Sequence, residues 1–231
     1  MPTADPGGTG PGAGFGPGVV HLCIDMQRLF GPDSPWTLPW MGRILSAAVR
    51  LAEHDPARTV FTRFIPPRRA EDAGGTWRPY FEKWPEVTRE HMDDDLLRLV
   101  PALERFAPPA RVLDKPVYSP WHGGGLDRLL EGRGIHTVIL SGGETDICVL
   151  AAVFGAVDRG YRVILASDAL CSAFDATHDA AMRIYRRRLT VQVEVLSVAD
   201  ILARGAAAGG GEQTAPGRVP PRQAPSPGAK P

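Results

Sequence analysis

Short apolar segments alternate with longer amphipathic ones through the middle of this chain. Six segments rich in Val, Ile, Leu and Phe show little polar alternation, which is typical of strands covered on both faces. They predict strands at 19–24, 59–64, 111–113, 137–140, 162–165 and 191–196. Helical spacing of apolar positions predicts helices at 41–53, 95–106, 126–131, 148–159, 176–187 and 197–202. The alternation predicts an α/β fold, a three-layer sandwich around a six-stranded, mostly parallel sheet.

The two ends differ in composition from this alternating region. Residues 1–18 contain seven Gly and four Pro, and residues 205–231 contain six Gly and six Pro. Such segments bury too little apolar surface to offset the entropy of the chain, so we expect both to be disordered. The folded domain is therefore predicted to run from 19 to 204.

The composition of the chain argues against a nucleic-acid or membrane partner. The 26 basic and 26 acidic residues cancel, so the chain lacks the basic excess that nucleic acids and anionic membranes attract. No apolar run is long enough to cross a bilayer, and the first residues do not resemble a secretion signal. Three cysteines do not make a disulfide framework. We expect a cytoplasmic, reduced protein with no nucleic-acid or membrane partner.

One segment, 65–92, interrupts the alternation. It is polar, contains four prolines and carries the aromatic residues Trp77, Tyr80, Phe81 and Trp84. Connections of this length are usually functional or disordered, and the aromatic content argues against disorder. The segment is either a wall or lid of a substrate pocket, a subunit contact, or a surface loop anchored by its own aromatic side chains. Trp77 and Tyr80 are accordingly candidates for substrate binding.

Cys148 lies where a strand is followed by a helix. The predicted strand 137–140 is broken by Ser and Gly residues, and helical spacing begins at the cysteine. In the first turn of a helix, unpaired N–H groups and the positive end of the dipole favour a thiolate. The alternative is a buried core cysteine, which is the prediction for Cys23 and Cys171.

Two further residues complete a possible nucleophile site. Asp25 closes the first predicted strand and Lys115 follows the third, and ligands of parallel sheets bind beyond such carboxyl ends. A carboxylate can take the thiol proton, an ammonium group stabilises both anions, and the N–H of Cys148 can bind an oxyanion. Asp114 competes with Asp25 as the partner of Lys115, although chain order favours Asp25. Asp168 is expected at another strand end.

The same edge of the sheet suggests two more substrate-binding candidates. Arg63 ends the second predicted strand and offers a guanidinium group to a carboxylate or carbonyl, the alternative being a surface arginine. Trp121 follows Lys115 closely in the sequence.

The chain resembles the isochorismatase-like cysteine hydrolase superfamily, in the amidohydrolase branch that includes nicotinamidases, N-carbamoylsarcosine amidohydrolase, biuret hydrolase and streptothricin hydrolase. The matching stretches are Ile24-Asp25-Met26-Gln27, Lys115 with Tyr118-Ser119, Gly143-Glu144-Thr145-Asp146-Ile147-Cys148-Val149, and Asp158 to Val163 leading to Ser167-Asp168-Ala169. The resemblance implies a catalytic triad of Asp25, Lys115 and Cys148. It also implies an oxyanion hole from the backbone N–H groups of Glu144 and Cys148, a cis bond between Gly143 and Glu144, and a homodimer or homotetramer.

Two departures refine what the resemblance implies. Isochorismatases proper cleave a vinyl ether without a nucleophilic cysteine, so Cys148 favours hydrolysis of a C–N bond in a small amide, lactam or carbamoyl substrate through a thioester. Nicotinamidases carry an Asp-x-His metal motif where this chain has Thr62-Arg63-Phe64-Ile65, and the histidines show no paired spacing, so we expect no metal and no cofactor. Two alternatives stay open: an ether hydrolase in which Asp25 is the acid, and a ligand-binding member without catalysis.

Overall fold

A six-stranded sheet forms the centre of the protein, in a computed structural model that describes residues 15–32 and 34–208. All strand pairs are parallel, in the order β3-β2-β1-β4-β5-β6. The strands are β1 (Val19–Ile24), β2 (Thr59–Phe64), β3 (Arg111–Lys115), β4 (Thr137–Gly143), β5 (Arg162–Cys171) and β6 (Val193–Leu196). The predicted α/β class with six strands is confirmed, and the sheet is parallel throughout.

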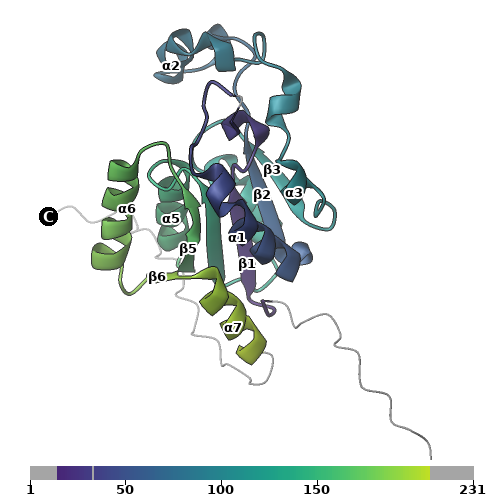
Figure 1. Cartoon of the computed structure of the whole chain (residues 1–231), viewed down its shortest axis with the longest axis vertical. Coiled ribbons are helices and arrows are strands. Elements are labelled where there is room, and N and C mark those ends of the chain that lie inside the picture. The colour runs from purple at the N-terminus through teal and green to yellow at the C-terminus, as the bar shows by residue number, and fades with distance from the viewer. Residues whose placement is uncertain (1–14, 33, 209–231) are drawn as a thin grey trace, which may run out of the picture.

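Helices cover both faces of the sheet (Figure 1). They are α1 (Met41–His54), α2 (Trp77–Lys83), α3 (Pro101–Glu104), α4 (Gly125–Leu130), α5 (Cys148–Asp158), α6 (Asp175–Arg188) and α7 (Val198–Ala208). Successive side chains of β1 point to opposite faces of the sheet. Leu22 packs with residues of α4, α5 and α6 on one face, and Cys23 packs with residues of α1 and α3 on the other. Cys23 is thus the packing residue that the sequence predicts. This alternation makes the three layers.

The helix predicted at 95–106 is wrong as a continuous element. A 3-10 turn, Asp94–Leu97, is followed by extended backbone and then by the short α3. Pro101 explains the break, because it lacks an N–H group and disfavours helical backbone at the residue before it. Val100 accordingly has ψ of 141°, and Pro101 occupies the first turn of α3, where proline is tolerated.

The predicted position of Asp168 at a strand end is also wrong. Strand β5 continues to Cys171, after a register shift opposite β4 between Leu140 and Gly142. The Asp168 carboxylate accepts a hydrogen bond of 2.7 Å from the backbone N–H of Val198, at the start of α7. Asp168 therefore satisfies a helix N-terminus and takes no part in a site at the sheet edge.

The folded part of the chain is longer at both ends than the predicted range of 19–204. Phe15 is buried and packs against the ring of His54, with ring centroids 4.8 Å apart. At the other end, α7 continues to Ala208. The rest of the two predicted tails lies outside the described residues.

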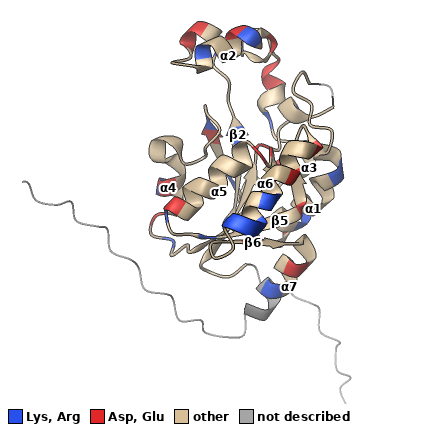
Figure 2. Ribbon diagram, turned by 90° about the vertical axis from the view of Figure 1, so that its left-hand side faces the viewer, with Lys and Arg blue, Asp and Glu red and all other residues tan. Residues whose placement is uncertain are grey.

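Charged side chains of both signs are mixed on the surface. Basic and acidic segments adjoin one another around α2 in Figure 2, where Arg78 and Glu82 form an ion pair of 3.1 Å. Within the described residues, no helix has the length and apolar character needed to cross a membrane.

Gly142 allows β4 to approach β1 closely at the edge where these strands end. Its φ is 98°, and a Cβ atom placed on it would lie 2.1 Å from the carbonyl oxygen of Ile24. The left-handed conformation favours glycine, and the contact with backbone leaves no space for a side chain. The neighbouring ends of β1 and β4 therefore depend on this residue.

Replacing Gly142 with alanine is expected to destabilise the fold more than the same change at Gly160. Gly160 also has a positive φ, 80°, but a Cβ atom there meets nothing within 4 Å. Left-handed backbone costs alanine about 1–2 kcal/mol at either position. The clash at Gly142 adds roughly 1–3 kcal/mol more. Urea unfolding of both variants measures the difference, and equal losses would contradict the close approach.

Candidate active site

Asp25, Lys115 and Cys148 meet at the carboxyl edge of the sheet. The Nζ atom of Lys115 lies 2.6 Å from Oδ2 of Asp25 and 3.6 Å from Sγ of Cys148. The side chains of Lys115 and Asp25 are only 2% and 1% exposed, so water screens this ion pair little. The structure thus brings together the three residues that the sequence singled out.

Asp25 is held by the end of β1 and by β2 beside it. The hydroxyl of Thr62 donates to Oδ1 of Asp25 at 2.6 Å and accepts from the Asp25 N–H at 3.1 Å. Asp25 has φ of 51°, a left-handed conformation that is uncommon outside glycine and clusters at functional sites. The carboxylate is therefore held by backbone conformation and by Thr62, whose role no sequence pattern indicated.

Lys115 pairs with Asp25, which resolves the competition with Asp114. Burial alone would lower the pKa of Lys115, but the interactions with Asp25 and, to a smaller extent, with Cys148 outweigh burial and raise this pKa. The ammonium group also donates to the carbonyl of Val117 at 3.1 Å and lies 5.2 Å from the centroid of the Phe64 ring. Lys115 is therefore a permanent positive charge between a carboxylate and a sulfur atom.

Cys148 is the first residue of α5, as the sequence predicts, but the expected thiolate does not follow. Burial raises the pKa of the Cys148 thiol, and the negative charge of Asp25 raises it further. Lys115 lowers this pKa, but by a smaller amount than burial and Asp25 raise it. The free protein therefore holds a neutral thiol beside a carboxylate that can accept its proton.

The turn between β4 and α5 is anchored by helix α6. Thr145 donates to the carbonyl of Cys171 through its N–H at 2.8 Å and its hydroxyl at 3.0 Å. Since that hydroxyl proton is used, Nδ1 of His178 donates to the Thr145 oxygen at 2.9 Å. The hydroxyl of Tyr185 donates to the Thr145 carbonyl at 2.7 Å. His178 is 33 positions from Thr145 in the sequence, so the contact depends on the tertiary fold.

Three backbone N–H groups of this turn have no acceptor among the described residues, those of Glu144, Asp146 and Cys148, and of these three residues Glu144 and Cys148 line a cavity in front of the thiol. The bond between Gly143 and Glu144 is cis, as the resemblance implies. Free N–H groups beside a nucleophile are the arrangement that binds an oxyanion.

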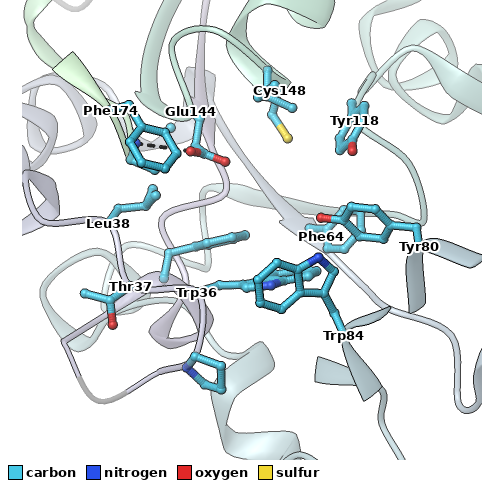
Figure 3. Close-up of a pocket in the computed structure, with 15 residues that line it drawn as sticks. Trp36, Thr37, Leu38, Phe64, Tyr80, Trp84, Tyr118, Glu144, Cys148 and Phe174 are labelled. Carbon is cyan, nitrogen blue, oxygen red and sulfur yellow. Dashed lines mark hydrogen bonds between the residues drawn. The ribbon is translucent and has the colours of Figure 1, made fainter. Parts of the chain in front are cut away.

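A cavity of about 370 Å³ opens in front of Cys148 (Figure 3). This volume suits a small molecule. Its walls come from the segment after β1, the end of β2, the segment 65–92, the turn before α5 and the start of the loop after β5. The lining residues are Phe30, Pro35, Trp36, Thr37, Leu38, Phe64, Tyr80, Trp84, Tyr118, Gly143, Glu144, Ile147, Cys148, Ala173 and Phe174.

The segment 65–92 supplies part of this wall. Tyr80 lines the cavity as predicted, and Trp84 of the same segment lines it as well. Trp77, predicted as a substrate-binding candidate, does not line the cavity; its ring packs on that of Tyr118, with ring centroids 4.7 Å apart. Of the roles left open for the segment, that of a pocket wall is the one the structure shows. Phe174 also lines the cavity, although its sequence neighbourhood carried no signal for such a role.

Arg63 and Trp121 lie outside the cavity lining, contrary to the prediction. The Arg63 guanidinium forms a two-point ion pair with Asp114, at 2.7 and 2.8 Å, on the outer side of β2 and β3. Trp121 is buried under α5, where its indole N–H donates to the carbonyl of Ala152 at 2.9 Å and its ring stacks on Tyr161. Closeness to Lys115 in sequence misled the prediction, because the chain passes to the opposite face of the sheet.

Gln27 is a residue of the site region whose role the sequence did not reveal. Its amide nitrogen donates to the carbonyls of Phe64 at 3.1 Å and Leu97 at 3.0 Å, and its amide oxygen accepts from the N–H of Phe64 at 2.6 Å. The side chain is fully buried. Gln27 therefore joins the ends of β1 and β2 to the turn at 94–97.

The residues at the nicotinamidase metal position do not fit a metal ion. Thr62 is bonded to Asp25, Arg63 is paired with Asp114, and Phe64 presents a ring to the cavity. None of the three offers a carboxylate or imidazole ligand. Within residues 15–32 and 34–208, no group of three or more His, Cys, Asp or Glu side chains is placed to hold a metal.

The fold and the site define an α/β protein with an acid, an ammonium group and a thiol at the carboxyl edge of a parallel sheet. The chain belongs to the isochorismatase family, whose isochorismatase domain it matches over residues 19–200. The resemblance read from the motifs is thereby confirmed.

Curated relatives share about a third of the aligned positions. Maleamate amidohydrolase of Pseudomonas putida is 30% identical over 175 residues, which span 72% of this chain and 78% of that protein. Ureidoacrylate amidohydrolase RutB of Methylorubrum extorquens is 31% identical over 173 residues, covering 65% of this chain and 68% of that protein.

Solved structures share the fold. A cysteine hydrolase from Pseudomonas syringae pv. phaseolicola has a TM-score of 0.70 at 22% identity, covering 89% of this chain and 100% of that chain. N-carbamoylsarcosine amidase from Thermoplasma acidophilum has a TM-score of 0.63 at 22% identity, covering 78% and 96%.

The opposing effects of Asp25 and Lys115 on the Cys148 thiol predict opposite changes in alkylation. Asp25→Asn removes the charge that raises the Cys148 pKa, so the pH at which iodoacetamide labels this thiol should fall. Lys115→Met removes the charge that lowers this pKa, so that pH should rise. A shift of one pH unit corresponds to a tenfold change in thiolate at neutral pH.

Peptide mass spectrometry distinguishes Cys148 from Cys23 and Cys171, which are buried with raised pKa values. Circular dichroism controls for unfolding of the two variants. Identical pH midpoints in the wild type and both variants would contradict the coupling of these three groups.

Proposed function

We propose that the protein is a cysteine amidohydrolase that cleaves a C–N bond of a small amide, lactam or carbamoyl substrate through a thioester. Curated relatives are named amidohydrolases, which supports hydrolysis of carbon–nitrogen bonds other than peptide bonds. The observation that carries the proposal is the thiol of Cys148, which lines the cavity beside the buried pair of Asp25 and Lys115.

The first half of the reaction forms the thioester. Asp25 accepts the proton of the Cys148 thiol as Sγ attacks the carbonyl carbon of the substrate. The electron pair of the C=O bond moves to oxygen and gives a tetrahedral oxyanion. When this intermediate collapses, the C–N bond breaks and the proton on Asp25 passes to the departing nitrogen, which leaves as ammonia or an amine.

The second half hydrolyses the thioester. Asp25, again ionised, removes a proton from water while the water oxygen attacks the thioester carbon. Collapse of the second oxyanion breaks the C–S bond, releases the carboxylic acid and returns the proton to sulfur. Lys115 stabilises the charges on Asp25 and Cys148 in both halves, which its short distances to the two groups support.

The oxyanion is assigned to the N–H groups of Glu144 and Cys148. Both N–H groups have no acceptor among the described residues, and both residues line the cavity. The contacts of Thr145 with Cys171 and Tyr185 keep the turn in place, so its N–H groups do not need to reorganise during the reaction.

Replacing Cys148 with alanine is expected to reduce turnover by at least roughly 10³-fold, because the nucleophile is lost. The assay measures ammonia release from a panel of primary amides, ureides and lactams. Cys23→Ala is the matched control, since Cys23 is a buried packing residue outside the cavity lining, and its turnover should persist. A thioester adduct on Cys148, trapped by acid quenching and detected by mass spectrometry, is the second expected result.

The same variant and the wild type together distinguish the two alternatives. An ether hydrolase that uses Asp25 as its acid would keep its activity in Cys148→Ala, and that outcome would overturn the thioester mechanism. A ligand-binding member would release no ammonia in the wild type.

A further inference from the structure

Aromatic side chains make up about half of the residues that line the cavity in front of Cys148. Rings from separate parts of the chain surround one space, which the close-up in Figure 3 shows below the sulfur atom. Trp36 lies 6.0 Å from both Phe64 and Tyr80, between ring centroids. The rings that line the cavity are Phe30, Trp36, Phe64, Tyr80, Trp84, Tyr118 and Phe174.

One carboxylate faces this aromatic space, that of Glu144. Figure 3 shows it pointing into the cavity between Phe174 and Cys148. Its Oε2 atom accepts one hydrogen bond of 3.1 Å, from the backbone N–H of Ala173. Burial raises the pKa of the Glu144 carboxyl, which means that its negative charge is poorly solvated.

No described residue of the lining supplies a compensating positive charge, since none is Lys or Arg. Lys115 beneath the cavity is neutralised by Asp25 at 2.6 Å. Burial raises the pKa values of Tyr80 and Tyr118, so both are neutral phenols. The charge that the cavity presents to a bound molecule is therefore that of Glu144.

Aromatic faces and a carboxylate attract the same kind of ligand. The negative faces of Trp and Tyr rings bind ammonium groups, most strongly when both are desolvated, and a buried carboxylate adds direct attraction. A ligand carboxylate beside Glu144 would be repelled. This differs from what the names of the relatives indicate, since maleamate and ureidoacrylate are themselves carboxylates.

We propose that this cavity selects an amide with a cationic group, a quaternary or protonated amine. That group lies between Glu144 and the aromatic rings of Trp36, Tyr80 and Trp84, while the amide carbonyl faces Cys148. The inference rests on the proposed hydrolase function for its amide end and on the cavity lining for its cationic end.

Binding of three matched primary amides tests the proposal. The first is the amide of trimethylammonium butanoic acid. The second replaces its trimethylammonium group with tert-butyl, and the third is glutaramic acid, which has the same chain length and ends in a carboxylate. Calorimetry on the full-length Cys148→Ala variant measures binding without turnover. The cationic amide should bind about tenfold more tightly than its neutral isostere, and glutaramic acid most weakly.

Variants of cavity residues test whether Glu144 and the aromatic rings cause the preference for the cationic amide. In the same background, Glu144→Gln keeps the shape and the backbone N–H but removes the charge, so the ratio of cationic to neutral affinity should fall by at least about fivefold. Trp84→Leu should reduce the ratio through loss of a ring. Glu82→Gln is the matched control, because Glu82 is exposed, pairs with Arg78 and does not line the cavity. Its ratio should stay unchanged.

Equal affinity for the cationic and neutral amides, or tightest binding of glutaramic acid, would overturn this inference. So would an unchanged ratio in a folded Glu144→Gln variant. Failure of the hydrolase function is a separate result: the wild type would release no ammonia from any amide, while the cationic preference in binding would persist.

Discussion

The site depends on one buried ion pair, between Asp25 and Lys115. Two charges that are almost fully removed from water are tolerated because each compensates the other at 2.6 Å. Removing either partner leaves an unpaired buried charge, which typically costs about 3–5 kcal/mol. The pair connects the ends of β1 and β3 across the intervening β2, and Cys148 reaches the same ammonium group from the start of α5. The relative positions of Asp25, Lys115 and Cys148 thus depend on this one contact between Asp25 and Lys115.

Backbone conformation holds the groups around that pair. Gly142 lets β4 come within contact of the β1 backbone, and Asp25 adopts a left-handed conformation directly after β1. Thr145 is bonded to the end of β5 and to Tyr185 of α6. These constraints come from strand ends and a packed helix. The groups around the ion pair are therefore held in place by strand ends and by α6, and such preorganisation is what electrostatic stabilisation of a transition state requires.

The segment 65–92 contributes to the wall of the cavity, whereas the sheet positions the Asp25, Lys115 and Cys148 side chains. The strand ends carry the acid, the ammonium group and the thiol, which the chemistry of amide hydrolysis uses. Tyr80 and Trp84 of the segment, with Trp36 and Glu144, line the cavity beside these groups. Such a division lets the substrate class change through the wall of the cavity while the reacting groups keep their positions.

The sequence by itself determined the α/β class, the helix that begins at Cys148, and Asp25 and Lys115 as candidates at strand ends, because apolar periodicity and strand ends are local signals. The choice of Asp25 over Asp114 as the partner of Lys115 came from the structure. The sequence predicted Tyr80 as a cavity residue but misplaced Trp121, because neighbours along a chain can pass to opposite faces of a sheet. Only the tertiary structure decided the raised pKa of the thiol and the exposure of the Glu144 carboxylate to a ring of aromatic side chains. Both depend on burial and on distances between residues far apart in sequence, and no local pattern encodes those quantities.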